Sequence, residues 1–238
     1  MGKSLIIKGA DFSVNGIAAE YQRLSWVGMP IVPDVYTDSG IIFANADPNN
    51  PYDELEFCIT IDSSKITYEE GGWKSGFRSM GSAYNTMTNC QVWFGYAFVA
   101  FYFDGKQAQK STYSYRTLSD GNQHTYKINR SGGTIDDDST TFMFDSPADL
   151  TQYSAAQLER GSVYLDSRRV SSGGDTSYLH ASSEDAVKIH WVKYRRNGEL
   201  ILDAIPVKRS SDNKIGFYDK VSGQYMFRND GSTPMYGE

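Results

Sequence analysis

Cysteine, histidine and long apolar runs are all scarce in this sequence. Its 238 residues include two cysteines and three histidines. The histidines are too widely separated for the ligand spacing of a zinc site. No apolar run approaches the roughly 18 residues of a membrane-spanning helix, and residues 1–8 hold no stretch of signal-peptide length. We therefore expect no membrane span, and no export by a signal in this sequence.

The two cysteines are Cys58, inside the apolar stretch Leu55–Ile61, and Cys90, directly before the apolar stretch Gln91–Phe103. Cysteine in such surroundings behaves as a small hydrophobic residue. This favours two buried free thiols. A single disulfide between neighbouring strands is the alternative.

Positive charge is also in short supply. The formal net charge is −6 and the isoelectric point is about 5.1. An acidic surface of this kind favours solubility. It argues against general nucleic-acid binding, which requires a basic face to displace counterions from phosphates.

Aromatic residues and glycine are plentiful. Aromatics make up 14% of the chain, with 17 Tyr, and there are 22 Gly. This composition is typical of a globular protein with strands joined by tight turns. A single all-β domain of about 200–250 residues is common, and no linker or internal repeat divides this chain.

Several segments alternate with the period of two that marks a half-buried strand. In Leu55–Ile61 the odd-numbered positions are apolar, and His124–Asn129 alternates in the same way after a turn at Ser119–Asn122. In Val187–Tyr194 the alternation predicts that Val187, Ile189, Trp191 and Lys193 share one face. The remaining predicted strands are Ser4–Lys8, Gly40–Ala44, Gln91–Phe103, Thr140–Phe144, Ser162–Leu165, Glu199–Pro206, Lys214–Asp219 and Gln224–Phe227.

Turn residues join these strands. Asn197-Gly198 predicts a type I′ hairpin, and Ser222-Gly223 predicts a second hairpin. Pro206 is expected to end its strand, because it has no N–H for a sheet ladder. Only Ser146–Arg160 has helical spacing, enough for one or two turns. The absence of longer helices between strands disfavours a parallel α/β fold.

The segment from Val187 to Asp230 contains two strand motifs and an aromatic hairpin. They read Leu202-Asp203-Ala204-Ile205-Pro206-Val207 and Gly216-Phe217-Tyr218-Asp219-Lys220-Val221-Ser222-Gly223. They resemble the closing part of the concanavalin A-like lectin/glucanase (LamG-like) domain of phage structural and gut-bacterial surface proteins. Tyr36-Thr37-Asp38-Ser39-Gly40 resembles the opening segment of that family, and His124-Thr125-Tyr126-Lys127 its middle strand.

The resemblance implies an all-β fold, a two-sheet antiparallel jelly-roll sandwich with one short helix. Residues 1–238 would form a single domain, with residues 1–23 as a candidate N-terminal attachment strand that resembles the start of several phage-encoded proteins. The implied role is a non-enzymatic virion surface component: a fibre, decoration or adhesin module. Its implied partners are other virion proteins, further copies of itself and a host surface glycan. The acidic charge argues against a nucleic-acid partner, and the lack of long apolar runs against a membrane.

Two other functions stay open: a glycan-acting hydrolase and a bacterial cell-surface carbohydrate-binding protein. Glucanases of this superfamily place two carboxylates on one strand. The nearest candidates here, Asp53-Glu54-Leu55-Glu56 and Ser183-Glu184-Asp185, do not predict alternating glutamates on a strand beside aromatic subsites. We therefore expect no catalytic residues.

Two loop regions are candidate binding sites. Trp73, Tyr84, Asn85 and Asn89 lie in a stretch rich in Gly and Ser, where rings can pack on sugar C–H faces and amides can bind hydroxyls. Asp136, Asp137 and Asp138 offer oxygen ligands for Ca²⁺, with a solvated acidic turn as the alternative. The last-hairpin aromatics Phe217, Tyr218, Tyr225 and Phe227 are interpreted as core residues and cross-strand pairs, not as a sugar platform.

Overall fold

The computed structural model describes the strands named below, including both C-terminal hairpins within residues 187–227. The described residues are 20–28, 35–42, 54–68, 77–78, 90–94, 99–103, 106–110, 120–129, 132–136, 140–143, 162–168, 179–181, 184–228, 231 and 235–238. The predicted strand Ser4–Lys8 and the predicted helix Ser146–Arg160 lie outside them.

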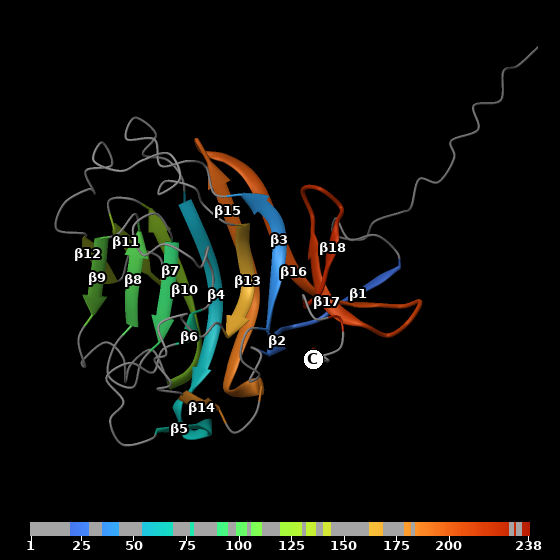
Figure 1. Cartoon of the computed structure of the whole chain (residues 1–238), viewed down its shortest axis with the longest axis horizontal. Helices are drawn as coiled ribbons and strands as arrows, with labels where there is room; N and C mark the ends of the chain where they lie inside the picture. The colour runs from blue at the N-terminus through green and yellow to red at the C-terminus, as the bar shows by residue number, and fades with distance from the viewer. Residues whose placement is uncertain are drawn as a thin grey trace, which may run out of the picture.

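One large antiparallel sheet dominates the structure (Figure 1). Its strands, in spatial order, are β12 (Thr140–Met143), β11 (Gly132–Ile135), β10 (Asp120–Asn129), β4 (Glu54–Asp62), β15 (Val187–Arg196), β16 (Glu199–Arg209), β17 (Ile215–Asp219) and β18 (Tyr225–Met226). Two short strands complete it: β1 (Tyr21–Arg23) pairs with β16, and β2 (Val27–Gly28) pairs with β15.

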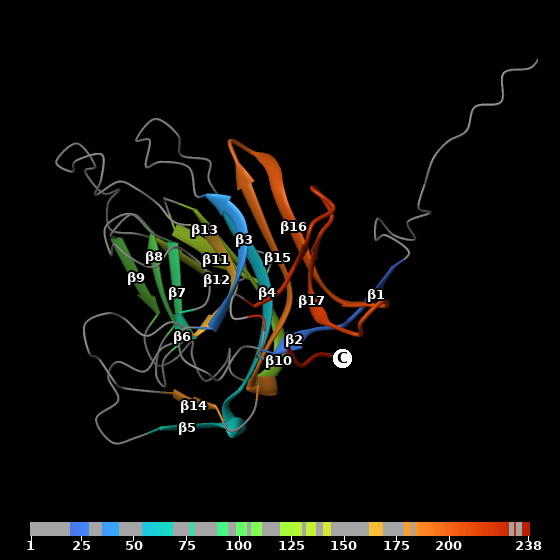
Figure 2. The same cartoon turned by 45° about the vertical axis from the view of Figure 1, so that its right-hand side comes forward.

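Three smaller antiparallel sheets accompany the large one. They are β3 (Val35–Ile42) with β13 (Ser162–Arg168); β5 (Ile66–Tyr68) with β14 (Leu179–Ala181); and β6 (Phe77–Arg78), β7 (Cys90–Phe94), β8 (Val99–Phe103) and β9 (Lys106–Lys110). Figure 2 shows β7, β8 and β9 side by side in a layer apart from β4, β15 and β16. The described part of the chain is thus built of antiparallel strands, and the predicted all-β class is confirmed.

Helical structure within the described residues is limited to short 3₁₀ turns at η1 (Ser63–Lys65) and η3 (Glu184–Ala186). Neither turn has the length or the apolar character of a bilayer-spanning helix, and no other described segment does.

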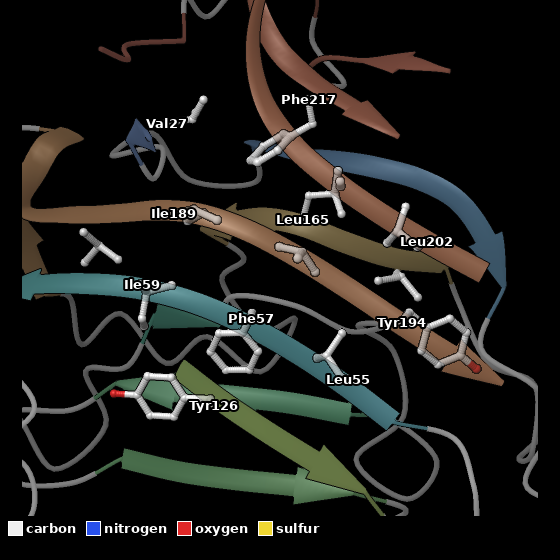
Figure 3. Close-up of a cluster of buried hydrophobic side chains, with 14 of the residues drawn as sticks. Val27, Leu55, Phe57, Ile59, Tyr126, Leu165, Ile189, Tyr194, Leu202 and Phe217 are labelled. Atoms are coloured by element: carbon white, nitrogen blue, oxygen red, sulfur yellow. The ribbon is translucent and has the colours of Figure 1, made fainter. Parts of the chain in front are cut away.

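The core lies against one face of the large sheet, called the core face below. The alternation in β4 puts Leu55, Phe57, Ile59 and Ile61 on this face, each at most 1% exposed. Figure 3 shows Leu165 of β13 among side chains from β4, β15 and β16, so β13 packs over the core face. Burial of each such side chain contributes about 1.5–3 kcal/mol. The facing predicted for Leu55–Ile61 is confirmed, but the strand is not half-buried, because Cys58 and Thr60 on its other face are buried as well.

The predicted alternation of Val187–Tyr194 is wrong beyond Ile189. Ile189 lies opposite Ile59, but the next paired residue, Trp191, lies opposite Cys58, so the strand contains a β-bulge at His190. A bulge inserts one residue and reverses the facing of those that follow. Trp191 and Lys193 therefore lie on the outer face of the sheet, opposite the core face, and Val192 is buried.

Both predicted C-terminal hairpins are confirmed. β15 and β16 join through Asn197 and Gly198, whose φ angles of 51° and 81° suit a type I′ turn. β17 and β18 pair with Tyr218 opposite Tyr225, and Gly223 in their turn has a φ of 75°.

Pro206 does not end its strand as predicted, since β16 continues to Arg209. Its carbonyl accepts a hydrogen bond from Leu24 N at 3.0 Å. Proline has no N–H to donate in return, and the paired strand β1 ends one residue earlier, at Arg23. Pro206 therefore lies where β1 has ended and no ladder hydrogen bond requires its N–H. A sheet tolerates proline at such a position.

Cys58 is a buried free thiol, so the alternative of a disulfide involving it is wrong. Burial raises the pKa of its thiol, and this outweighs the opposing hydrogen bond with Thr125. Cys90 begins β7, and its side chain lies outside the described residues.

Candidate functional site

The structure describes few of the binding residues predicted from the sequence. Trp73, Tyr84, Asn85 and Asn89 all lie outside the described residues, as do Asp137 and Asp138. The loop site for a glycan therefore stays a prediction. Of the acidic run, only Asp136 is described.

Both carboxylate oxygens of Asp136 already have protein partners. Oδ1 accepts a hydrogen bond from Thr125 N at 2.9 Å, and Oδ2 lies 2.5 Å from His124 Nδ1. The other ring nitrogen of His124, Nε2, lies 3.1 Å from Asp120 Oδ1. Asp120 also accepts from Asn122 N at the predicted turn, where Gly121 has a φ of 83°. In the described part of the chain, no cluster of three or more His, Cys, Asp or Glu residues is arranged to hold a metal ion.

The first candidate carboxylate pair, Glu184 and Asp185 in η3, forms ion pairs. Glu184 Oε1 accepts from Arg228 Nη1 at 2.9 Å, and Asp185 Oδ2 lies 2.5 Å from Lys65 Nζ. These contacts join distant parts of the chain. They give both carboxylates a structural role.

The other candidate pair, Glu54 and Glu56, was not expected to alternate on a strand beside an aromatic residue, but it does. Glu54 and Glu56 do alternate on one strand, β4, and therefore face the same side of the sheet, away from the core. Trp191, from the neighbouring strand, lies on that side too. The sequence did not predict this arrangement, because the facing of Trp191 depends on the bulge. Both glutamates bind cations, however: Arg195 Nη1 lies 2.9 Å from Glu56 and 3.7 Å from Glu54, and Lys127 Nζ lies 3.3 Å from Glu54.

A group of aromatic rings lies on the outer face of the large sheet, over β1 and the C-terminal strands β15 to β18. We call it the aromatic strip, and its members are Tyr21, Trp191, Tyr218, Tyr225 and Phe227. The strip surrounds a small apolar base formed by Ile205 and Val207 of β16.

The three tyrosine rings of the strip contact one another across strands. Tyr21 of β1 stacks on Tyr225 with ring centroids 5.4 Å apart, and its centroid lies 4.9 Å from that of Tyr218. Tyr225 in turn lies 6.0 Å from Phe227. Trp191, Tyr21 and Tyr225 are partly buried, whereas Phe227 is 45% exposed. The predicted core position of Phe217 and the predicted cross-strand pairing of Tyr218 with Tyr225 are confirmed, whereas Phe227 is exposed and not a core residue.

Gly216 leaves room for the ring of Tyr225. A Cβ at this position would clash with the carbonyl oxygen of Met226 and would lie 2.8 Å from two ring atoms of Tyr225, closer than side-chain carbons approach in proteins. Asp219, in the same motif, accepts hydrogen bonds from the N–H groups of Asp203, Val221 and Ser222. The Gly216–Gly223 motif thus builds the hairpin and supports one side of the strip.

Three cations lie over rings of the strip. Lys193 Nζ is 4.6 Å from the ring centroid of Trp191, and Lys214 Nζ is 5.6 Å from that of Phe227. The guanidinium of Arg209 is 4.5 Å from the centroid of Tyr225 and forms a two-point ion pair with Asp212. Burial raises the pKa of Tyr225 to about 12, so its hydroxyl stays neutral at physiological pH. The strip therefore combines flat apolar surface with positive charge.

Comparison of the sequence with protein-family models and with curated proteins gave no match in either case.

Proposed function

We propose that this chain is a non-enzymatic glycan-binding module with a concanavalin A-like jelly-roll sandwich, serving as a fibre, decoration or adhesin component of a phage virion surface. The virion assignment rests on the sequence resemblance of residues 187–230 and of the N-terminal segment. Assembly into a homo-oligomer and contacts with other virion proteins belong to the same proposal.

The binding part of the proposal rests on one observation: the described carboxylate pairs are held by cations, while aromatic rings gather on an outer face. A retaining or inverting glycosidase needs one carboxylic acid to donate a proton and a second carboxylate to act as nucleophile or base. Arg195 and Lys127 instead hold Glu54 and Glu56 in ion pairs. The strip offers flat rings without a reactive group, which suits binding without chemistry.

The test is a glycan array probed with the purified full chain, with and without EDTA, together with its mass by light scattering. Specific binding and a defined oligomer are expected. Loss of binding with EDTA would support a calcium site at Asp136–Asp138. A monomer that binds no glycan would overturn the proposal.

The hydrolase alternative predicts a different result. A hydrolase would shorten a polysaccharide, and Glu54→Gln or Glu56→Gln would abolish that activity. On our proposal no polysaccharide is shortened by the wild-type chain. The cell-surface alternative is tested by cell fractionation, where it predicts the chain on the bacterial envelope and our proposal predicts it in purified virions.

A further inference from the structure

We propose that the aromatic strip is a binding site for an acidic saccharide, one that carries carboxylate or sulfate groups. This inference rests on the proposed glycan-binding function and adds a place on the fold and a ligand class to it.

The rings supply the apolar part of such a site. Aromatic faces carry partial negative charge, and the slightly positive C–H groups on the flat side of a pyranose ring pack well against them. Trp191 lies at the β15 end of the strip and Phe227 near the β18 end, with Tyr21, Tyr218 and Tyr225 grouped by ring contacts. A row of rings across several strands suits an extended chain of sugars better than a single sugar.

The lysines supply the charge. Lys193 pairs in register with Glu56 on one side and Asp203 on the other. Both of these carboxylates are bound by other cations, Glu56 by Arg195 at 2.9 Å and Asp203 by Lys220 at 2.7 Å. The ammonium of Lys193 lies instead over Trp191. Such an exposed cation–π contact contributes only about 0.5–1 kcal/mol, so it leaves the charge available to an anion.

Lys214 is placed in the same way at the other end of the strip. Its ammonium lies over Phe227, the most exposed ring of the strip. No described carboxylate lies within ion-pair distance of Lys193 or Lys214. Arg209, by contrast, is neutralised by Asp212 and holds the ring of Tyr225 in place. Two ammonium groups, one beside the partly buried ring of Trp191 and one beside the exposed ring of Phe227, thus indicate a ligand with anionic groups on an otherwise C–H-rich chain.

The net charge of the chain favours an acidic saccharide over a nucleic acid as the ligand of the strip. The whole chain has a net charge of −6. Duplex DNA carries one charge per about 1.7 Å and needs many cations to displace its counterions. Two lysines suit a sparsely charged chain, in which neutral sugar faces alternate with acidic groups.

The experiment measures binding of the purified full chain by calorimetry to two panels of probes. Hyaluronan, alginate and polysialic acid oligosaccharides are the acidic panel, and dextran and laminarin oligosaccharides are the neutral one. Acidic probes should bind at least about tenfold more tightly than neutral ones. That preference should shrink between about 50 mM and about 500 mM NaCl, because salt screens exposed charges.

Four variants test the place of binding. Lys193→Gln and Lys214→Gln remove the charge with a slightly shorter polar side chain and should each weaken acidic-probe binding several-fold, and about tenfold together. Trp191→Ala and Phe227→Ala should weaken binding about tenfold, with circular dichroism as the check on folding. Lys188→Gln and Tyr236→Ala are matched controls, because Lys188 lies over the ring of Trp26 and Tyr236 is an exposed ring beside Trp26, both outside the strip. Neither should change affinity.

The outcomes separate this inference from the proposed function. Glycan binding that ignores all four strip variants, or that prefers neutral probes, overturns the inference and leaves the function standing. Binding to none of the probes or array glycans overturns both. Two further results overturn the inference alone: tighter binding of oligothymidylate than of any saccharide, or conversion of an oligomer to a monomer by Phe227→Ala, which would make the strip an interface between copies.

Discussion

Arg228 and Asp166 form an ion pair in the interior, with Nε of Arg228 3.6 Å from Oδ2 of Asp166 and side chains 1% and 0% exposed. Arg228 also donates to both carboxylate oxygens of Glu184 and to the carbonyl of Gly28. Asp166 accepts from Thr37 N at 2.6 Å. One guanidinium thus joins the C-terminal segment to β2, β13 and η3, and through Asp166 to β3.

Replacing Arg228 by Met should destabilise the fold strongly. Removing one partner of a buried ion pair costs about 3–5 kcal/mol, because the remaining charge stays buried and uncompensated. Urea unfolding followed by circular dichroism measures this loss. Lys220→Met is the matched control: its pair with Asp203 has a lysine that is one-third exposed, and exposed pairs contribute about 0–1 kcal/mol. Equal losses in the two variants would contradict the proposed role of Arg228.

The sequence predicted local features of the fold well. Alternation in Leu55–Ile61 predicts a strand with one buried face, because one residue in two must face the core. Asn197-Gly198 predicts its own hairpin, because both positions require positive φ. The bulge at His190 has no such local signal. Two successive residues oppose Cys58 because of how β15 packs on β4, and this packing reverses the predicted facing of Trp191.

The same limit explains why the sequence did not predict the aromatic strip. Tyr21 reaches Tyr225 only because β1 pairs with the far end of β16. The hydrogen bond from Arg228 to Gly28 likewise spans 200 residues. Pairings of this range depend on the topology of the whole sheet, which local patterns do not encode. The Gly216–Gly223 motif was found because all its residues lie in one hairpin.

Gly216→Ala should cost at least about 1–3 kcal/mol, because the added methyl group clashes with the backbone carbonyl of Met226 and with the ring of Tyr225. Gly198→Ala is the comparison: the space beside Gly198 is open, but its φ of 81° strains any L side chain by about 1–2 kcal/mol. The NMR resonances of the Tyr225 ring should distinguish the two variants. NMR of ¹³C-tyrosine-labelled protein should show these resonances shifted by Gly216→Ala and unchanged by Gly198→Ala. Unshifted resonances in Gly216→Ala would show that the glycine does not support the ring.

His124 should titrate above 6.5, the ordinary pKa of histidine. Burial alone would lower its pKa, but the hydrogen bonds and charges of Asp136 and Asp120 outweigh burial and raise it. The folded state then binds the proton more tightly than the unfolded state. The resulting stability is fully present below pH 6.5 and is lost as pH rises through the folded pKa. Urea unfolding across this window should show the advantage of wild type over His124→Gln shrinking with rising pH. A constant advantage would contradict the charged pairing.

His190 should behave in the opposite way. Burial lowers its pKa below 6.5 and Lys188 adds to this effect, against the opposing hydrogen bond with the carbonyl of Ser25. That bond, 2.8 Å from Nδ1, requires the proton on Nδ1, so Nε2 accepts from the hydroxyl of Thr60 at 3.0 Å. Protonation of Nε2 would force the Thr60 hydroxyl to turn from donor to acceptor.

Stability linked to His190 is therefore present above pH 6.5 and is lost as pH falls towards the folded pKa. Long-range ¹H–¹⁵N NMR should show one ring as the Nδ1–H tautomer with a midpoint below 6.5, and His190→Asn should remove that signal. His180→Gln identifies the resonances of the third histidine and leaves only His124 and His190 to compare. If His190 titrated at or above 6.5, or carried its proton on Nε2, the hydrogen bonds assigned to its ring would be wrong.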